Sequence, residues 1–481
     1  MMTKSYSACK SFPFRSLTTQ TIETSLTQQQ PQERSDLLDI TPTSNLFAST
    51  PTKALILSLV NLRLMSIEPA VKVGSVVMNS PIILSESDSV LKKSVLKIVK
   101  NTVYNHFCAG EDLKEVEKTV ENLWKEGLKG IIDYGLEDAD VSEDCDRNLK
   151  EFLKTIDMSS HLPASSVSFG CVKITAICPI SLLKRVSDHL RWEYSHPSTG
   201  SSSAWKVPSF PVLSDSSPFY HTTSPPPPLT PSEENDLHLA HQRLSTLCQR
   251  CSDLNLPLLI DAEYTSVQPA IDHMTYSAMR KFNKMGENVR PIVYGTVQTY
   301  MRDSMERMIL AADAAEKEDV QIAFKLVRGA YMSRETKLAG SLKEKSPIHS
   351  TISETHTFYD ACMDIMLQKV SGGRASVVLA THNIQSGKHA ATKVEELGIR
   401  KDDKRLQFAQ LKGMADGFSL GLRNAGFNVS KYLAFGPVQM VLPYLLRRAE
   451  ENRGVLTSSS FDQHLIRDEL KRRLKAIAVL L

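Results

Sequence analysis

Eight short apolar runs, each separated from the next by a stretch of helical period, fill the chain from residue 130 onward. The runs are GIIDYG from Gly130, VKITAI from Val172, PLLIDAE from Pro257, PIVYGTV from Pro291, IAFKLVRGA from Ile322, SVVLATHN from Ser376, LQFAQLKG from Leu406 and VSKYLAFG from Val429. Strand and helix alternating eight times predict an α/β fold of the (βα)8 barrel type. A doubly wound sheet alternates in the same way, but no G-x-G-x-x-G turn follows any of the runs, which disfavours it.

The flanks of the predicted barrel, which covers residues 130–460, differ from it in composition. Residues 1–44 form a leader in which Lys4, Lys10 and Arg15 precede the first acid, Glu23, among many Ser and Thr residues. This composition predicts an organelle transit peptide and not a secretory signal, with a plain disordered tail as the alternative. Residues 45–129 are expected to form a helical arm, and residues 461–481 a C-terminal helix. The apolar stretch at 54–78 contains charged residues and is too interrupted for a membrane span.

One segment interrupts the alternation, between residues 194 and 232. It holds nine of the chain's 23 prolines, mixed with many serines. Such a composition predicts a disordered insertion that contributes no core. We prefer this linker interpretation to a role as a polyproline ligand.

Charge and cysteine content exclude several classes of function. The 57 basic and 54 acidic residues nearly balance, so we expect no nucleic-acid partner. Cys248 and Cys251 form a single CQRC pair without a second pair or a histidine pair at ligand spacing. We therefore interpret them as ordinary helix cysteines and expect no metal site.

Polar residues end most of the predicted strands, where barrel enzymes carry their chemistry. They are Asp261, Glu263, Gln298, Arg328, Tyr331, the triplet Thr381–His382–Asn383, and Gln410. Lys173 and Lys325 lie within predicted strands, where an unpaired ammonium would be costly. Either lysine could point outward between helices, but two of them together favour the barrel mouth.

The last strand leads into a helix that contains two adjacent arginines. Pro443 suits the first turn of this helix and Gly454 its end. Glu451 lies within one turn of both Arg447 and Arg448, and one carboxylate cannot neutralise two guanidinium groups. The pair could therefore bind an anion such as a carboxylate, although a solvated helix face would show the same pattern.

Several of these segments resemble motifs of the proline dehydrogenase (proline oxidase) family, most closely its plant mitochondrial members. The resemblance runs from about residue 45 to residue 460. It is carried by LIDAEYTSVQPAI from Leu259, YGTVQTY from Tyr294, FKLVRGAYM from Phe324, ATHN from Ala380, FAQLKGM from Phe408 and FGPVQMVLPYLLRRAEEN from Phe435.

The resemblance implies a distorted (βα)8 barrel whose last helix lies over the barrel mouth. It implies non-covalent FAD and hydride transfer from proline C5 to flavin N5, with Δ1-pyrroline-5-carboxylate as the product. Electrons would pass to a membrane quinone. The expected location is the matrix side of the inner mitochondrial membrane, with peripheral association.

The resemblance also assigns roles to individual residues. Arg447 and Arg448 would hold the substrate carboxylate, Glu451 would fix them, and Lys173 would face the same carboxylate. Asp261 would lie beside flavin and substrate, and Lys325 near flavin N5. The residues expected to line FAD are Gln298, Val327, Gly329, Ala330, Tyr331, Thr381, His382 and Asn383. Leu411 and Tyr444 would line the substrate pocket. Phe435 would stand where many relatives have a tyrosine that packs on the substrate, so it should favour proline over 4-hydroxyproline.

Three alternatives remain open on the sequence. The first is a hydroxyproline dehydrogenase. The second is a Schiff-base barrel of the class I aldolase type, with Lys173 or Lys325 as nucleophile. The third is a catalytically inactive scaffold that acts through the proline-rich insertion. No residue is clearly assigned as a general base.

Overall fold

The computed structural model describes residues 38, 43–67, 76, 80, 89–197, 205–286, 290–454 and 456–480. Side chains 65, 66, 449–459, 479 and 480 lie outside this description. All described residues belong to one unit, Leu37–Leu481. The predicted transit peptide falls almost wholly on residues outside the described part.

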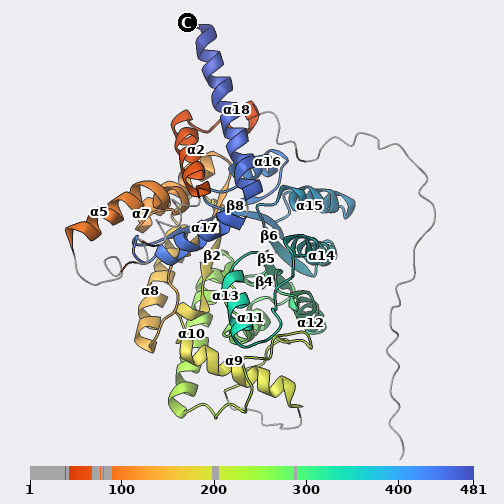
Figure 1. Cartoon of the computed structure of the whole chain (residues 1–481). Helices are drawn as coiled ribbons and strands as arrows, with labels where there is room; N and C mark the ends of the chain where they lie inside the picture. The colour runs from red at the N-terminus through yellow and green to blue at the C-terminus, as the bar shows by residue number, and fades with distance from the viewer. Residues whose placement is uncertain are drawn as a thin grey trace, which may run out of the picture. The chain divides into compact units, whose positions relative to one another are not determined.

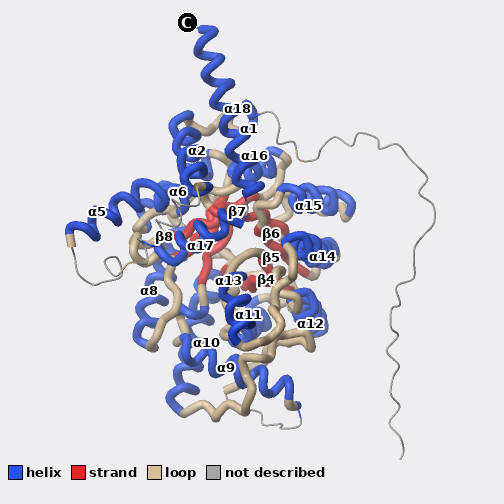
Figure 2. Tube along the Cα trace, in the orientation of Figure 1, coloured by secondary structure: helices blue, strands red, loops and turns tan. Residues whose placement is uncertain are grey.

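Eight parallel strands close into a barrel in the order β1 to β8, which confirms the predicted fold class (Figures 1 and 2). The β-branched and aliphatic runs form strands because they are buried on both faces, as parallel strands between a filled interior and outer helices must be. The strands are β1 Lys129–Tyr134, β2 Val167–Val172, β3 Leu258–Ile260, β4 Val293–Gln298, β5 Ile322–Val327, β6 Ala375–Ala380, β7 Leu406–Leu411 and β8 Val429–Phe435.

The second strand differs from the prediction. The run from Val172 was expected to be extended, but β2 is the preceding segment VSFGCV, and Ile174–Ala176 form a short 3-10 turn. The glycine and serine of β2 interrupt its apolar residues, so its sequence does not look like a buried strand. VKITAI has the composition of a strand but does not form one. Lys173 therefore directly follows β2 at the barrel mouth and does not lie inside the strand.

Helices surround the barrel on its outside. Two of them begin with capping boxes, Thr230 with Glu233 and Thr351 with Glu354, which satisfy the free amides of the first turn. The helices are α8 Ser142–Ser159, α9 Ile180–Ser195, α10 Pro231–Asp253, α11 Gln268–Phe282, α12 Ser304–Lys317, α13 Met332–Ser341, α14 Ile352–Ser371, α15 Ile384–Glu396 and α16 Asp416–Asn424. Cys248 and Cys251 are buried in α10, and no group of metal-binding residues occurs in the described part of the chain.

The proline-rich segment contradicts the prediction of a disordered insertion without core. Between residues 205 and 229, Trp205, Phe210 and Leu229 are buried in the main hydrophobic cluster. Ser217 Oγ donates to Asp303 Oδ2 at 2.8 Å, and His221 Nε2 lies 2.8 Å from Thr265 Oγ1 in the loop after β3. The prediction was wrong because average composition concealed the apolar residues spaced between the prolines. An extended segment rich in proline also has few amides that need partners when it packs.

The N-terminal arm contacts the β7 and β8 side of the mouth. Tyr104 is fully buried, and its hydroxyl donates to the carbonyl of Gly436 at 2.8 Å. The amide of Ala109 donates to the carbonyl of Ala434 at 2.8 Å. The arm consists of α1 Thr43–Leu46, α2 Thr52–Ser66, α5 Val90–Val99, a π-helical turn Lys100–Tyr104, α6 Asn105–Phe107 and α7 Leu113–Lys125.

Two helices follow the barrel, α17 Leu442–Gly454 and α18 Leu456–Leu480. Both contact α2 of the arm, so the two ends of the described chain meet. None of the helices in the described ranges is long and apolar enough to cross a membrane.

Candidate active site

The alternation of side chains along the strands determines which residues face the barrel axis. Each strand contributes to an interior cluster that includes Ile131, Cys171, Leu259 and Ala323, with Tyr432 packed against it. Because side chains alternate with a period of two, the residue two positions further along points to the same side, nearer the mouth. In β1, β2, β3 and β5, or directly after them, that residue is charged: Asp133, Lys173, Asp261 and Lys325.

These four charges form a buried network at the mouth. Lys173 Nζ lies 3.1 Å from Asp133 Oδ2, with the two side chains 8% and 1% exposed. Lys325 forms an ion pair with Asp261. Tyr432 adds a hydrogen bond, because its hydroxyl donates to Asp261 Oδ2 at 2.8 Å. Buried charges are stable only when paired in this way.

The network keeps both lysines charged. Burial alone would lower the pKa of Lys173, but attraction to Asp133 and Asp261 raises it well above its usual value. Burial likewise opposes the charge of Lys325, and Asp261 raises the pKa of this lysine. For Asp261, burial acts to raise the pKa, yet Lys325 and Lys173 bring it below its usual value. The mouth therefore carries fixed ammonium groups.

Helix α17 lies across this mouth, in front of the strands in Figure 1. Arg447 donates from both terminal nitrogens to the carboxylate of Glu137, at 3.0 and 3.1 Å. Its guanidinium carbon also lies 5.8 Å from the centre of the Tyr331 ring. Glu137 follows β1 and Tyr331 follows β5, on opposite sides of an eight-stranded barrel. One side chain therefore spans the opening, as the resemblance to the family had implied for the last helix.

The arginine pair is not a solvated helix face. Arg448 is only 7% exposed, and its guanidinium carbon lies 4.9 Å from the ring of Tyr444. Sequence spacing suggested Glu451 as a partner of Arg447, and the structure shows that Glu137 is a partner of this arginine. The side chain of Glu451 lies outside the described part of the chain. Helical spacing could not reveal Glu137, because this contact joins residues 310 positions apart.

The residues expected to line a cofactor lie together at the ends of β4, β5 and β6. Gln298 Nε2 donates to the carbonyl of Glu263 at 2.7 Å. His382 Nε2 accepts from the amide of Leu411 at 3.1 Å, and burial lowers the pKa of His382 to about 3, so its ring is neutral. Asn383 caps α15 by accepting from the amide of Ser386. Thr381 accepts from Arg328. Val327 is the last residue of β5, and Gly329, Ala330 and Tyr331 occupy the turn between β5 and α13.

The backbone of that turn is open and unusual. Gly329 has φ of +94°, and no heavy atom lies within 4 Å of the position where a Cβ would stand. Tyr331 adopts the left-handed conformation, with φ of +52°. A non-glycine residue in this conformation is uncommon and often marks a functional turn.

The predictions for the three pocket-lining residues have different outcomes. Leu411 and Tyr444 belong to one apolar cluster beneath α17, so the structure brings them together. The prediction for Phe435 is wrong. Tyr432 faces the axis, so Phe435, three positions further, points outward. Its ring lies 4.9 Å from that of Tyr134 and belongs to the outer core.

Asp133, Glu137 and Tyr432 are residues of the site that the sequence interpretation missed. Asp133 and Tyr432 lie within runs recognised as strands, and counting in steps of two from apolar neighbours would have placed both at the axis. Phe435 is the aromatic residue of the last strand nearest the Pro–Val pair, but Tyr432 is the one that faces the axis. No comparable local signal marks Glu137.

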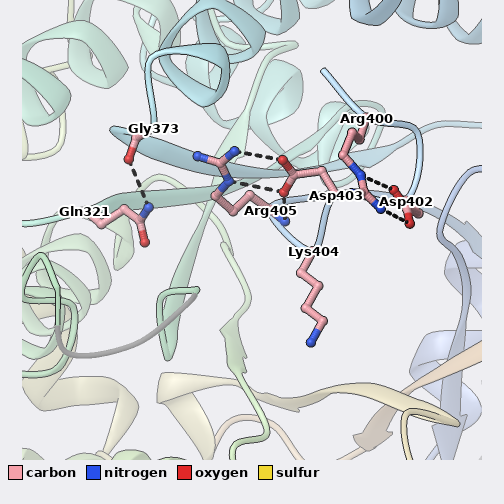
Figure 3. Close-up of a pocket in the computed structure, with 7 residues that line it drawn as sticks. All are labelled: Gln321, Gly373, Arg400, Asp402, Asp403, Lys404 and Arg405. Atoms are coloured by element: carbon pink, nitrogen blue, oxygen red, sulfur yellow. Dashed lines mark hydrogen bonds and ion pairs between the residues drawn. The ribbon is translucent and has the colours of Figure 1, made fainter. Parts of the chain in front are cut away.

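A separate polar hollow of about 510 Å³ lies at the opposite end of the barrel, before the first residues of β5 and β7 (Figure 3). Four of its five charged residues are paired with one another: Arg405 with Asp403 at 2.7 Å and Arg400 with Asp402 at 2.8 Å. The N-terminal face of a barrel usually serves stability. This hollow therefore offers no competing centre for chemistry.

Several known proteins are similar to this chain in sequence or in fold. Residues 116–461 match the sequence profile of the family described as Proline dehydrogenase. "Proline dehydrogenase 1, mitochondrial" from Arabidopsis thaliana is 51% identical over 94% of this chain and 90% of its own length. "Hydroxyproline dehydrogenase" from Xenopus laevis is 34% identical over 83% and 84%. The crystal structure of proline utilization A (PutA) from Bdellovibrio bacteriovorus, inactivated by N-propargylglycine, has a TM-score of 0.59 at 19% identity. The match covers 83% of this chain and 37% of the PutA chain, and it supports the fold alone.

Proposed function

The chain belongs to the proline dehydrogenase family, and we propose that it oxidises L-proline to Δ1-pyrroline-5-carboxylate with FAD at the mouth of the barrel. The observation that carries this proposal is the buried network of Asp133, Lys173, Asp261 and Lys325 beneath Arg447. The network places fixed ammonium groups at the mouth, and apolar side chains fill the barrel interior below them.

The arginines and Lys173 suit the carboxylate end of proline. A guanidinium has five N–H donors, and Arg447 donates two hydrogen bonds to Glu137. Its remaining donors, with Arg448 on the next position of α17, can take a second carboxylate. Lys173 adds a charged ammonium from the barrel side. Together they would orient the substrate so that its ring lies near the ends of the strands.

The residues present fit FAD. When bound, FAD supplies the hydride acceptor, with N5 receiving the hydride from proline C5. Lys325 is held as an ammonium by Asp261, so it would place a fixed positive charge beside that acceptor. The open backbone at Gly329 leaves room for a bulky group, and Gln298, Thr381 and the neutral His382 supply polar atoms along the same strand ends. Glu451 is proposed to fix the arginine pair, in addition to Glu137.

Transfer of electrons to a membrane quinone completes the proposed reaction. The Arabidopsis relative is described as mitochondrial, which agrees with the composition of the leader. We infer a mitochondrial enzyme that associates peripherally with the inner membrane on its matrix side.

The structure bears differently on the three alternatives. A Schiff-base mechanism needs an unprotonated lysine. Lys173 and Lys325 are both ion-paired with raised pKa values, so neither suits that role. A scaffold acting through a free proline-rich linker conflicts with the packing of residues 205–229. Hydroxyproline oxidation is the second candidate, because a relative with that name aligns over most of the chain, although at 34% and not 51% identity.

An absorption spectrum of the purified protein tests the proposal. We expect a flavin spectrum that bleaches when L-proline is added without oxygen, and FAD in the released chromophore. A folded protein that stays colourless and inactive with added FAD would contradict it. Faster bleaching by 4-hydroxyproline than by proline would favour the second candidate.

A further inference from the structure

Helix α2 is apolar on two opposite sides. Leu55 and Leu62 are 2% and 3% exposed and pack into the core. The other side carries five large apolar residues that are between 40% and 55% exposed: Ile56, Leu57, Val60, Leu64 and, at the C-terminal cap, Ile67. At about 100° per residue, these five fall within an arc of about 100°. They therefore form one continuous outward stripe, called here the α2 stripe.

Helix α18 runs antiparallel to α2 and extends past it. Arg473 donates to Thr52 Oγ1 and to the carbonyl of Phe47, both at 2.8 Å, at the start of α2. Gln463 Nε2 contacts the carbonyl of Leu62 at 3.4 Å, near the other end. Beyond Arg473, Leu474 and Ile477 are 67% and 55% exposed. Figure 1 shows this end of α18 projecting beyond α2.

The charge around these apolar residues is mainly positive, although Glu68 directly follows Ile67 in the sequence. Residues 43–67 contain Lys53 and Arg63 and no acid. On α18, Lys471, Arg472 and Lys475 are exposed. Of the acids nearest to them, Glu469 is buried and bound to Arg472 and Arg473, and Asp468 lies 3.7 Å from Lys471. An apolar stripe flanked by long cationic side chains is typical of helices that lie in the interface of an anionic bilayer.

We propose that the α2 stripe and the last turns of α18 form a docking surface for a lipid bilayer with anionic headgroups. The charge distribution favours this occupant over a second copy of the chain. A twofold contact through the stripe would bring Lys53 and Arg63 of both copies together, and juxtaposed like charges are unfavourable. Anionic headgroups complement the same residues.

The proposed surface lies one helix away from the active site. Both α2 and α18 contact α17, which carries Arg447 across the barrel mouth. An enzyme docked through α2 would therefore hold its mouth close to the membrane, where a lipid-soluble electron acceptor is dissolved. The inference rests on the proposed function for its purpose, but the docking can be measured without any turnover.

Flotation of the full-length protein with vesicles tests the docking surface. Vesicles of phosphatidylcholine alone are compared with vesicles that also contain phosphatidylglycerol. We expect wild type to float with the anionic vesicles, and Ile56→Ser/Val60→Ser to lose roughly tenfold or more of its partitioning. Lys471→Gln/Lys475→Gln should lose most of the preference for anionic lipid. Ile352→Ser is the matched control, because Ile352 is 59% exposed at the start of α14 and should float like wild type.

Proline oxidation with a water-soluble dye as acceptor is measured on every variant and should stay unchanged. Wild type that oxidises proline but floats with neither vesicle would overturn the docking surface, as would a stripe variant that floats like wild type. A dimer that forms without lipid and is lost in the stripe variant would assign the stripe to a second copy instead. A protein that floats as expected but does not oxidise proline would support docking and contradict the proposed function.

Discussion

Replacement of Arg447 by methionine should weaken the binding of proline through its carboxylate. Methionine keeps the length and the apolar stem of the side chain but removes the planar fork that spans the mouth. The guanidinium already holds Glu137 at 3.0 and 3.1 Å, so its geometry suits a carboxylate. Loss of a charge-assisted hydrogen bond costs about 1.5 to 3 kcal/mol, which is roughly a ten- to 150-fold fall in kcat/KM. Most of this fall should come from a higher KM.

The assay compares L-proline with pyrrolidine, which has the same ring but no carboxylate. Arg447→Met should lower kcat/KM for proline by the factor above and change that for pyrrolidine little. Arg400→Met is the control, because Arg400 forms a similar pair with Asp402 on the surface at the other end of the barrel (Figure 3). Equal losses for proline and pyrrolidine would show that Arg447 acts by holding α17 in place, and an unchanged KM for proline would refute the role altogether.

Three further predictions concern stability and pH. Trp205→Ala should lower the free energy of unfolding by about 3–5 kcal/mol, because a buried indole is removed; an unchanged melting temperature would show that the proline-rich segment does not pack. Phe435→Ala should destabilise by a similar amount, and a raised KM for proline in stable protein would contradict the outward orientation of this ring. Burial raises the pKa of Glu263 from 4.5 to about 8, so the folded state binds the proton more tightly, and the stability from this group is lost as pH rises through about 8. Between about pH 5 and about pH 9, the free energy of unfolding measured with urea should therefore fall less for Glu263→Gln than for wild type. Parallel pH curves for the two proteins would refute the raised pKa of Glu263.

Local patterns determined the architecture before any contact was known. Seven of the eight runs cover most of the strand they predicted, because parallel strands buried on both faces have continuous apolar sequences, whereas the run from Val172 shares only that residue with β2. The same patterns placed Lys325 within one strand and Asp261 at the end of another, and the structure pairs the two at the barrel mouth. The helix from Leu113 to Lys125 lies within the helical arm predicted for residues 45–129.

Other features required the tertiary structure. Composition concealed the packing of residues 205–229, because burial depends on where single residues such as Trp205 fall and not on their average. The partner of Arg447 could not be read from the chain, since Glu137 meets it only after the barrel closes and α17 folds over the mouth. The orientations of Phe435 and Tyr432 depend on which set of alternate residues in β8 faces the barrel axis. The pairing of β8 with β1 and β7 decides this when the barrel closes. Sequence periodicity specifies which residues share a face, whereas only the packing of distant segments decides which face is inside and what each buried charge meets.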